Sequence, residues 1–179
     1  FSEPETKAIR NFCEEHQFKI ALNYHTYGNY LIHPWGYLNR QTEDSSLFQV
    51  LSGLFTEHNK YKYGLSSETV GYATNGVCDD WMYGDITAKN RIFAFTPEVG
   101  FSFWPKKQDI DFLNKSCMPM NLLAAWNVHS YAYLKDNSAC NLTEERASFS
   151  VNVTRSGLKQ NVITLSVTPI TSNVKITSL

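Results

Sequence analysis

Apolar residues follow two different spacings along this chain. Residues 18–24 and 91–96 form short, almost continuous apolar runs, which is typical of strands covered on both faces. Residues 2–16, 42–55 and 106–133 instead place apolar side chains three or four positions apart, which indicates helices with one buried stripe. The two patterns together predict an α/β fold, in which residues 18–24 form a central strand with helices on both faces.

Several residues mark where these elements begin, bend or are connected. Ser2 and Glu5 have the spacing of a capping box at the start of the first helix. Pro119 falls inside the last helical pattern, and we expect a kink there because proline removes a backbone donor. Residues 27–37 and 64–76 are rich in the Gly, Pro, Asn and Ser of turns, and we expect surface loops.

The pattern changes after Lys135. Apolar residues alternate at positions 149, 151 and 153, and again at 163, 165 and 167, with a Ser-Gly turn between the two sets. This alternation predicts a β-hairpin. Because two or three strands are rarely stable alone, we expect residues 136–179 to begin a second, β-rich domain and residues 1–135 to belong to the first.

Charge and composition argue against several functions. The 16 basic and 17 acidic residues give a net charge of -1 and a pI near 6.6, so no basic field is present to hold nucleic acid. No apolar run reaches the roughly 20 residues of a membrane span. Cys13, Cys78, Cys117 and Cys140 lack the short spacings of a cysteine zinc site, although one or two disulfides stay open.

Two of the predicted strands end on side chains of catalytic type. Residues 91–96 are followed at once by Pro97 and Glu98, and residues 18–24 are followed by His25. A carboxylate at the exit of a buried strand is costly unless it is paired, bound to a metal, or placed where substrate and water meet. A metal-type ligand and a base-type carboxylate at two strand ends favour hydrolysis as the function.

Six short motifs follow one another over residues 1–133. They are Ser2-Glu-Pro-Glu-Thr6, Asn23-Tyr-His25-Thr-Tyr27-Gly28, Pro34-Trp-Gly-Tyr37, Tyr72-Ala-Thr-Asn-Gly76, Asp79-Asp80-Trp81 and Phe95-Thr-Pro-Glu98. Each motif is weak alone, but their order and spacing resemble the zinc carboxypeptidases, the family of pancreatic carboxypeptidases A and B. The fourth and fifth motifs are more similar to bacterial secreted members, which implies a secreted, periplasmic or extracellular protein.

The resemblance implies a mixed sheet with helices on both faces and one zinc ion at the strand ends. His25 matches the family's third zinc ligand, and Glu98 matches the glutamate that takes a proton from zinc-activated water. Tyr72 matches a mobile tyrosine that closes over the terminal residue of the substrate. Tyr27 matches a tyrosine that lines an outer subsite.

Asp79 matches the floor of the family's specificity pocket. An acidic residue there would pair with a C-terminal Lys or Arg side chain of the substrate. Val77 and Cys78 stand where the family has a small Gly-Ser pair, so the shape of this pocket is left undecided. The alternative for Asp79 is a structural role at a helix N-terminus, stabilised by backbone N–H groups.

The chain carries only part of the implied site. The first two zinc ligands of the family come from a His-x-x-Glu motif, and no histidine in this sequence has a glutamate three residues later. The Asn-Arg pair that grips the substrate carboxylate is missing as well. We therefore expect the C-terminal half of a catalytic domain, inactive alone, with the remaining zinc ligands on polypeptide upstream.

Two functions stay open at this point. The first is a metallocarboxypeptidase that removes single residues from the C-terminus of a peptide or protein. The second is a noncatalytic relative that binds peptides or glycans. Glu98 favours the enzyme, because a binding module has no need for a general base.

Overall fold

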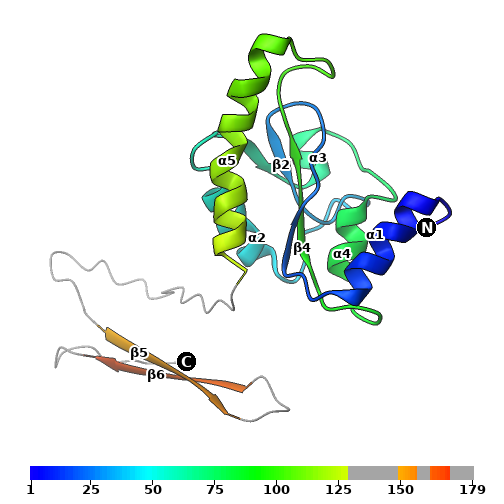
Figure 1. Ribbon diagram of the computed structural model, residues 1–179. Coiled ribbons are helices and arrows are strands. Elements are labelled where there is room, and N and C mark those ends of the chain that lie inside the picture. Colours follow the sequence, from blue (N-terminus) through cyan, green and yellow to red (C-terminus); the bar gives the residue numbers. More distant parts are fainter. Residues whose placement is uncertain (129–148, 157–161, 170–179) are drawn as a thin grey trace, which may run out of the picture. The chain divides into compact units, whose positions relative to one another are not determined.

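The structure is a computed structural model that describes residues 1–128, 149–156 and 162–169. The chain divides into two compact units, Phe1–Tyr131 and Ala132–Leu179. The first unit contains a four-stranded sheet with helices, and the second contains a two-stranded sheet (Figure 1). The assignment of residues 136–179 to a separate domain stays a prediction. In the part of the chain that the structure describes, no helix is both long and apolar enough to cross a membrane.

The sheet of the first unit has the strand order β1-β4-β2-β3. Its strands are β1 (Ile20–Leu22), β2 (Tyr30–Ile32), β3 (Lys62–Gly64) and β4 (Phe93–Glu98). β4 runs parallel to β1, with Ala94 opposite Ala21, and antiparallel to β2, with Pro97 opposite Leu31. β2 and β3 are parallel. The predicted α/β class with a mixed sheet is confirmed.

Two expectations about this sheet are wrong. The central strand is β4, whereas β1 lies at the sheet edge within the described residues and is only half-buried. The segment 27–37, expected to be a loop throughout, contains β2, because Leu31 and Ile32 are buried in the core. Three apolar positions are too few to show an alternating period, so the pattern could not reveal this strand.

Helices cover both faces of the sheet (Figure 1). They are α1 (Pro4–Glu15), α2 (Ser45–Phe55), α3 (Ser66–Thr69), α4 (Cys78–Gly84) and α5 (Ile110–Trp126). Phe93 and Phe95 pack with the buried side chains of α2 and α5, whereas Ile92 and Ala94 pack with those of α1 and α4. Alternate residues from Ile92 to Phe95 therefore serve two separate cores, which explains why these four positions are all apolar.

The predicted capping box at the start of α1 does not form. The N-cap is Glu3, with no side-chain capping bond, and Pro4 occupies the first helical turn. Proline suits this position, because its missing N–H has no helical acceptor there. The helix therefore begins at Pro4, and Ser2 and Glu5 are not at the positions that a reciprocal cap requires.

The segment 64–76 is also more ordered than expected. β3 ends at Gly64, and the short helix α3 follows, with the Glu68 carboxylate accepting a hydrogen bond from the Leu65 N–H at 2.9 Å.

At the other end of the unit, a 3-10 turn precedes α5, which continues through Pro119 and ends at Trp126.

The predicted hairpin in the second unit is confirmed. β5 (Phe149–Ser156) and β6 (Val162–Pro169) are antiparallel, with Val151 opposite Val167 and Val153 opposite Leu165. The further alternation near Val174 lies outside the described residues, as does Cys140. Cys13, Cys78 and Cys117 are free thiols.

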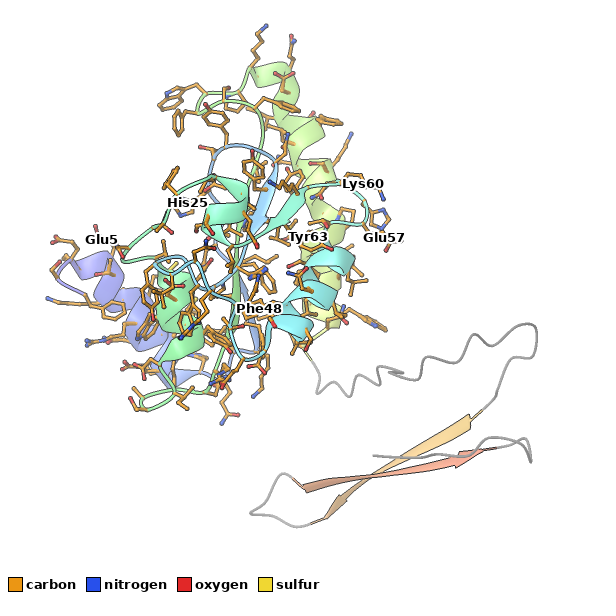
Figure 2. The ribbon with its side chains drawn as sticks, turned by 180° about the vertical axis from the view of Figure 1, so that it is seen from behind. Glu5, His25, Phe48, Glu57, Lys60 and Tyr63 are labelled. Carbon is orange, nitrogen blue, oxygen red and sulfur yellow. The ribbon has the colours of Figure 1, made fainter. Side chains whose placement is uncertain are left out.

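Phe48 of α2 lies at the centre of the larger core (Figure 2). Its ring is fully buried and contacts those of His33, Tyr83 and Phe95 at centroid distances of 5.0 to 5.3 Å.

In the full-length protein, Phe48→Ala should lower the free energy of unfolding by about 3–5 kcal/mol, because it removes this burial and leaves a cavity. Urea denaturation measures the change. Val50→Ala, on the exposed side of the same helix, is the control and should cost about 0.5 kcal/mol or less. A cost as small for Phe48→Ala would contradict this packing.

Candidate active site

His25 and Glu98 lie directly opposite each other. Glu98 ends β4, and the segment after β1 continues the parallel pairing as an isolated bridge between His25 and Glu98. The His25 N–H donates to the Pro97 carbonyl, and the Val99 N–H donates to the His25 carbonyl, both at 2.9 Å. Opposite residues of parallel strands project to the same face of a sheet. The backbone therefore holds the imidazole and the carboxylate side by side.

Both side chains line one cavity of about 440 Å³. The His25 side chain is exposed, and Glu98 is half-buried. Burial raises the pKa of the Glu98 carboxyl above its ordinary value, while the neighbouring His25 opposes this rise. A raised pKa keeps the proton affinity of a carboxylate high, which suits a group that accepts and returns a proton.

Asp79 lines the same cavity but is almost fully buried, with 3% of its surface exposed. One carboxylate oxygen accepts a hydrogen bond from the Asn23 amide at 2.5 Å, and the other accepts one from the Thr96 hydroxyl at 2.7 Å. Burial raises the pKa of Asp79 to about 6, and these two hydrogen bonds oppose the rise. Asp79 thus connects α4 to β4 and to the segment before His25.

The two tyrosines singled out in the sequence have different positions. Tyr72 lines the cavity from the connection between α3 and α4, and 62% of its surface is exposed. Tyr27 is also exposed, but it does not line this cavity, and its ring contacts Phe103 edge-on at 4.8 Å. The structure therefore brings His25, Glu98, Tyr72 and Asp79 together at one cavity. Tyr27 follows His25 by two residues in the sequence but lies outside the cavity lining.

Sequence reasoning missed the residues that support this cavity. Asn23 and Thr96 hold Asp79, and the sequence analysis gave neither residue a role, although both stand within the quoted motifs. Asp80, to which the sequence analysis gave no role, accepts hydrogen bonds from the backbone N–H groups of Gly36 at 2.8 Å and Tyr37 at 3.3 Å. It therefore fixes the loop after β2 against α4, a contact between residues that are distant in the sequence.

The described residues do not form a metal site by themselves. No group of three or more His, Cys, Asp or Glu side chains among them could hold a metal ion. The exposed imidazole of His25 could serve as one ligand, but a catalytic zinc ion is held by three protein ligands. Any zinc at this position therefore requires ligands from outside the described part of the chain.

The fold is shared with solved carboxypeptidase structures. Bovine thrombin-activatable fibrinolysis inhibitor in complex with tick carboxypeptidase inhibitor matches 71% of this chain, with a TM-score of 0.59 and 23% identity, and 46% of that structure is covered. A second structure of thrombin-activatable fibrinolysis inhibitor gives a TM-score of 0.60, again over 71% of this chain, with 34% of that structure covered and 23% identity.

The chain belongs to the zinc carboxypeptidase family, whose sequence profile matches residues 1–118. Human carboxypeptidase A6 is 33% identical over 107 residues, which are 55% of this chain and 23% of that protein. Bovine carboxypeptidase O is 38% identical over 88 residues, which are 45% of this chain and 23% of that protein. The matched part of the chain thus spans about a quarter of the length of these relatives, and the predicted membership of the family is confirmed.

Proposed function

We propose that the full-length protein is a zinc metallocarboxypeptidase that hydrolyses the last peptide bond of peptides or proteins. The observation that carries this proposal is the pairing of His25 with Glu98 as opposite residues at one solvent-accessible cavity. Family membership over residues 1–118 supports it independently.

In this proposal Glu98 is the general base. Its carboxylate takes a proton from the water that attacks the scissile carbonyl, and it then delivers that proton to the leaving amine. His25 supplies one zinc ligand, and the others come from upstream polypeptide. Zinc, when bound, polarises the carbonyl and makes water a better nucleophile at neutral pH without redox chemistry.

The other residues of the proposed site bind the substrate. Tyr72, exposed on a connection between two short helices, closes over the terminal residue. Tyr27 lines an outer subsite, where its contact with Phe103 holds the ring. Asp79 lies at the base of the specificity pocket. A secreted, periplasmic or extracellular location stays a prediction.

The direct test is release of a C-terminal amino acid by the full-length protein. We expect peptides ending in Phe or in Lys to lose that residue, and a zinc chelator should abolish the release until zinc is restored, because the chemistry depends on zinc. Chromatography with mass detection measures the released amino acid and the shortened peptide. Binding of peptides or glycans without any release would instead establish the noncatalytic alternative.

The same two peptides decide the role of Asp79. If its carboxylate recognises a basic side chain, the peptide ending in Lys should be the better substrate, and Asp79→Asn should reduce that preference. The existing hydrogen bonds from Asn23 and Thr96 compete with this role. Preference for Phe in the unaltered protein would exclude the basic pocket and leave Asp79 a structural residue.

A further inference from the structure

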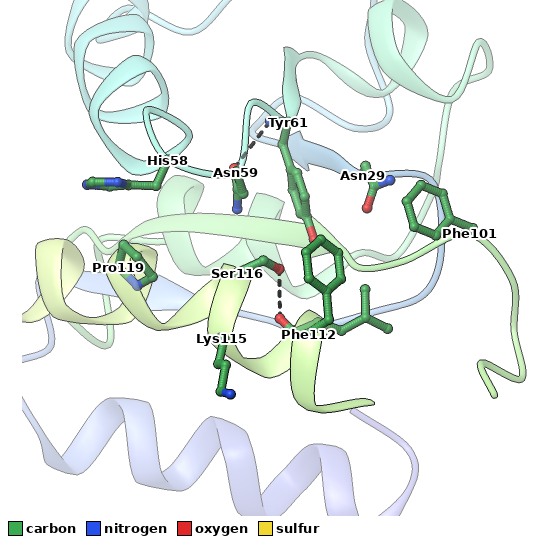
Figure 3. Close-up of a pocket in the computed structure, with 10 residues that line it drawn as sticks. Asn29, His58, Asn59, Tyr61, Phe101, Phe112, Lys115, Ser116 and Pro119 are labelled. Atoms are coloured by element: carbon green, nitrogen blue, oxygen red, sulfur yellow. Dashed lines mark hydrogen bonds between the residues drawn. The ribbon is translucent and has the colours of Figure 1, made fainter. Parts of the chain in front are cut away.

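A second cavity, of about 430 Å³, lies between α5 and the turn that follows α2 (Figure 3). It shares no lining residue with the cavity that contains His25 and Glu98. Two phenylalanines line it from different elements: Phe101 comes from the connection between β4 and α5, and Phe112 comes from α5 itself. We call this cavity the Phe101–Phe112 groove. Its volume is in the range of sites that bind small ligands or short peptide segments.

The walls of the groove are apolar and largely open to water. Phe101 has 74% of its surface exposed and Phe112 has 64%, whereas Tyr61, which also lines the groove, is buried, with 6% exposed. Exposed aromatic rings that converge on a concave surface are typical anchors of binding sites, because they bury a large area at a small entropic cost. The groove therefore offers two exposed aromatic rings to an apolar side chain.

Polar groups in the groove match a peptide group. The Asn59 side-chain NH₂ is buried without a hydrogen-bond partner, while its oxygen accepts from the Tyr61 N–H at 3.2 Å. Pro119 has no N–H to donate to the Lys115 carbonyl one turn earlier in α5. One unpaired donor and one carbonyl without its helical donor complement the C=O and N–H of an extended peptide.

The charge of the groove is close to neutral. None of the described residues that line it is acidic, and the Lys115 side chain points away from Tyr61 (Figure 3). A neutral apolar segment is therefore a better match than a cationic ligand, because no carboxylate in the lining would compensate its desolvation.

The backbone connects the groove firmly to the candidate catalytic residue. Phe101 follows Glu98 by three residues, and Gly100 between them adopts a φ of +87°, a left-handed conformation that favours glycine. The Gly100 N–H donates to the Asn29 side-chain oxygen, and the Gly28 N–H donates to the Gly100 carbonyl, both at 3.0 Å. The position of Phe101 is thus fixed relative to the end of β4.

We propose that the Phe101–Phe112 groove binds an apolar segment of the polypeptide substrate, upstream of the residue that is released. This inference rests on the proposed carboxypeptidase function and names its substrate class: polypeptides long enough to reach the groove, with an apolar residue at the matching position. Short substrates use the catalytic cavity alone and gain nothing from the groove.

The test uses the full-length protein and two kinds of substrate. One is an N-acetylated dipeptide, and the other is a set of N-acetylated dodecapeptides that end in the same dipeptide. In the long peptides a single Phe moves stepwise through an otherwise Gly-Ser sequence. At one or two positions of this Phe, kcat/KM should rise about tenfold above that of the Phe-free dodecapeptide, mainly through a lower KM.

Surface variants show whether the groove causes this gain. Phe112→Ser should remove it while leaving hydrolysis of the dipeptide unchanged. Leu122→Ser is the matched control, because Leu122 is on the same helix, is similarly exposed at 63%, and does not line the groove. The control should keep the full gain. Because both side chains are exposed, neither change threatens the fold.

Failure of this inference can be told apart from failure of the proposed function. Hydrolysis that is independent of the position of Phe, or a gain that survives in Phe112→Ser, overturns the groove and leaves the carboxypeptidase intact. If no substrate is hydrolysed, binding of a C-terminally amidated, fluorescein-labelled Phe dodecapeptide is measured by anisotropy. Binding that Phe112→Ser abolishes supports the groove. Absence of binding overturns it. Displacement of the peptide by maltohexaose, a glycan probe, also overturns it.

Discussion

Replacement of Glu98 by Gln in the full-length protein is expected to lower kcat by about a thousandfold, the scale of a general base. The amide has nearly the same size as the carboxylate but cannot accept the proton of the attacking water. Glu98 is half-buried at the end of β4 and faces His25, so a neutral replacement should not disturb the fold. Initial rates of C-terminal residue release, with KM measured separately, test the prediction.

Two controls accompany Glu98→Gln. Its zinc content should equal that of the unaltered protein, because the proposal does not make Glu98 a zinc ligand. Glu57→Gln, an exposed change at the turn after α2, should leave kcat unchanged (Figure 2). A Glu98→Gln variant that keeps more than about a tenth of the activity would remove the general base from the mechanism.

The sequence predicted those parts of the fold that a local pattern determines. The apolar run predicted at 91–96 lies largely within β4, because the part of a strand that is covered on both faces needs apolar side chains on both. The hairpin β5–β6 followed from its alternation in the same way. The order of the strands was not predictable in this manner, since the pairing of β4 with β1 and β2 joins residues that are far apart in the sequence.

The candidate site shows the same division. The ends of two buried runs identified His25 and Glu98, and parallel pairing brings these two residues opposite each other. The environment of Asp79 was not visible, because Asn23 and Thr96 reach it only through the fold. Hydrogen bonds between distant side chains leave no periodic signal, and neither does a groove whose walls come from four separate segments.

The position of Asp79 also limits what its charge can do. Its pKa of about 6 results from burial, and two donors already occupy its oxygens. A substrate cation would therefore have to compete with Asn23 and Thr96 for the carboxylate. In the absence of such a cation, the residue is best placed to hold α4 against β4, beside the paired His25 and Glu98.

Replacement of His25 by Ala should weaken zinc binding by the full-length protein at least about a hundredfold, because losing only a hydrogen-bond partner of a zinc ligand already costs 10–100-fold. His25 is exposed at the cavity, and its backbone forms the bridge to Glu98, so alanine removes the imidazole while the backbone hydrogen bonds remain. Competition with a chromophoric chelator measures the affinity. Peptidase activity should fall in parallel when zinc is limiting and recover in part at high zinc.

His16→Ala provides the matched histidine control, because His16 is exposed at the end of α1, where its ring bonds to the Phe12 carbonyl at 2.9 Å. That variant should keep the zinc affinity of the unaltered protein. The 179-residue chain alone should bind zinc weakly and release no amino acid, because one histidine cannot replace three ligands. Unchanged zinc affinity in His25→Ala would show that the ion, if bound, is held elsewhere, and the pairing of His25 with Glu98 would then lose its catalytic meaning.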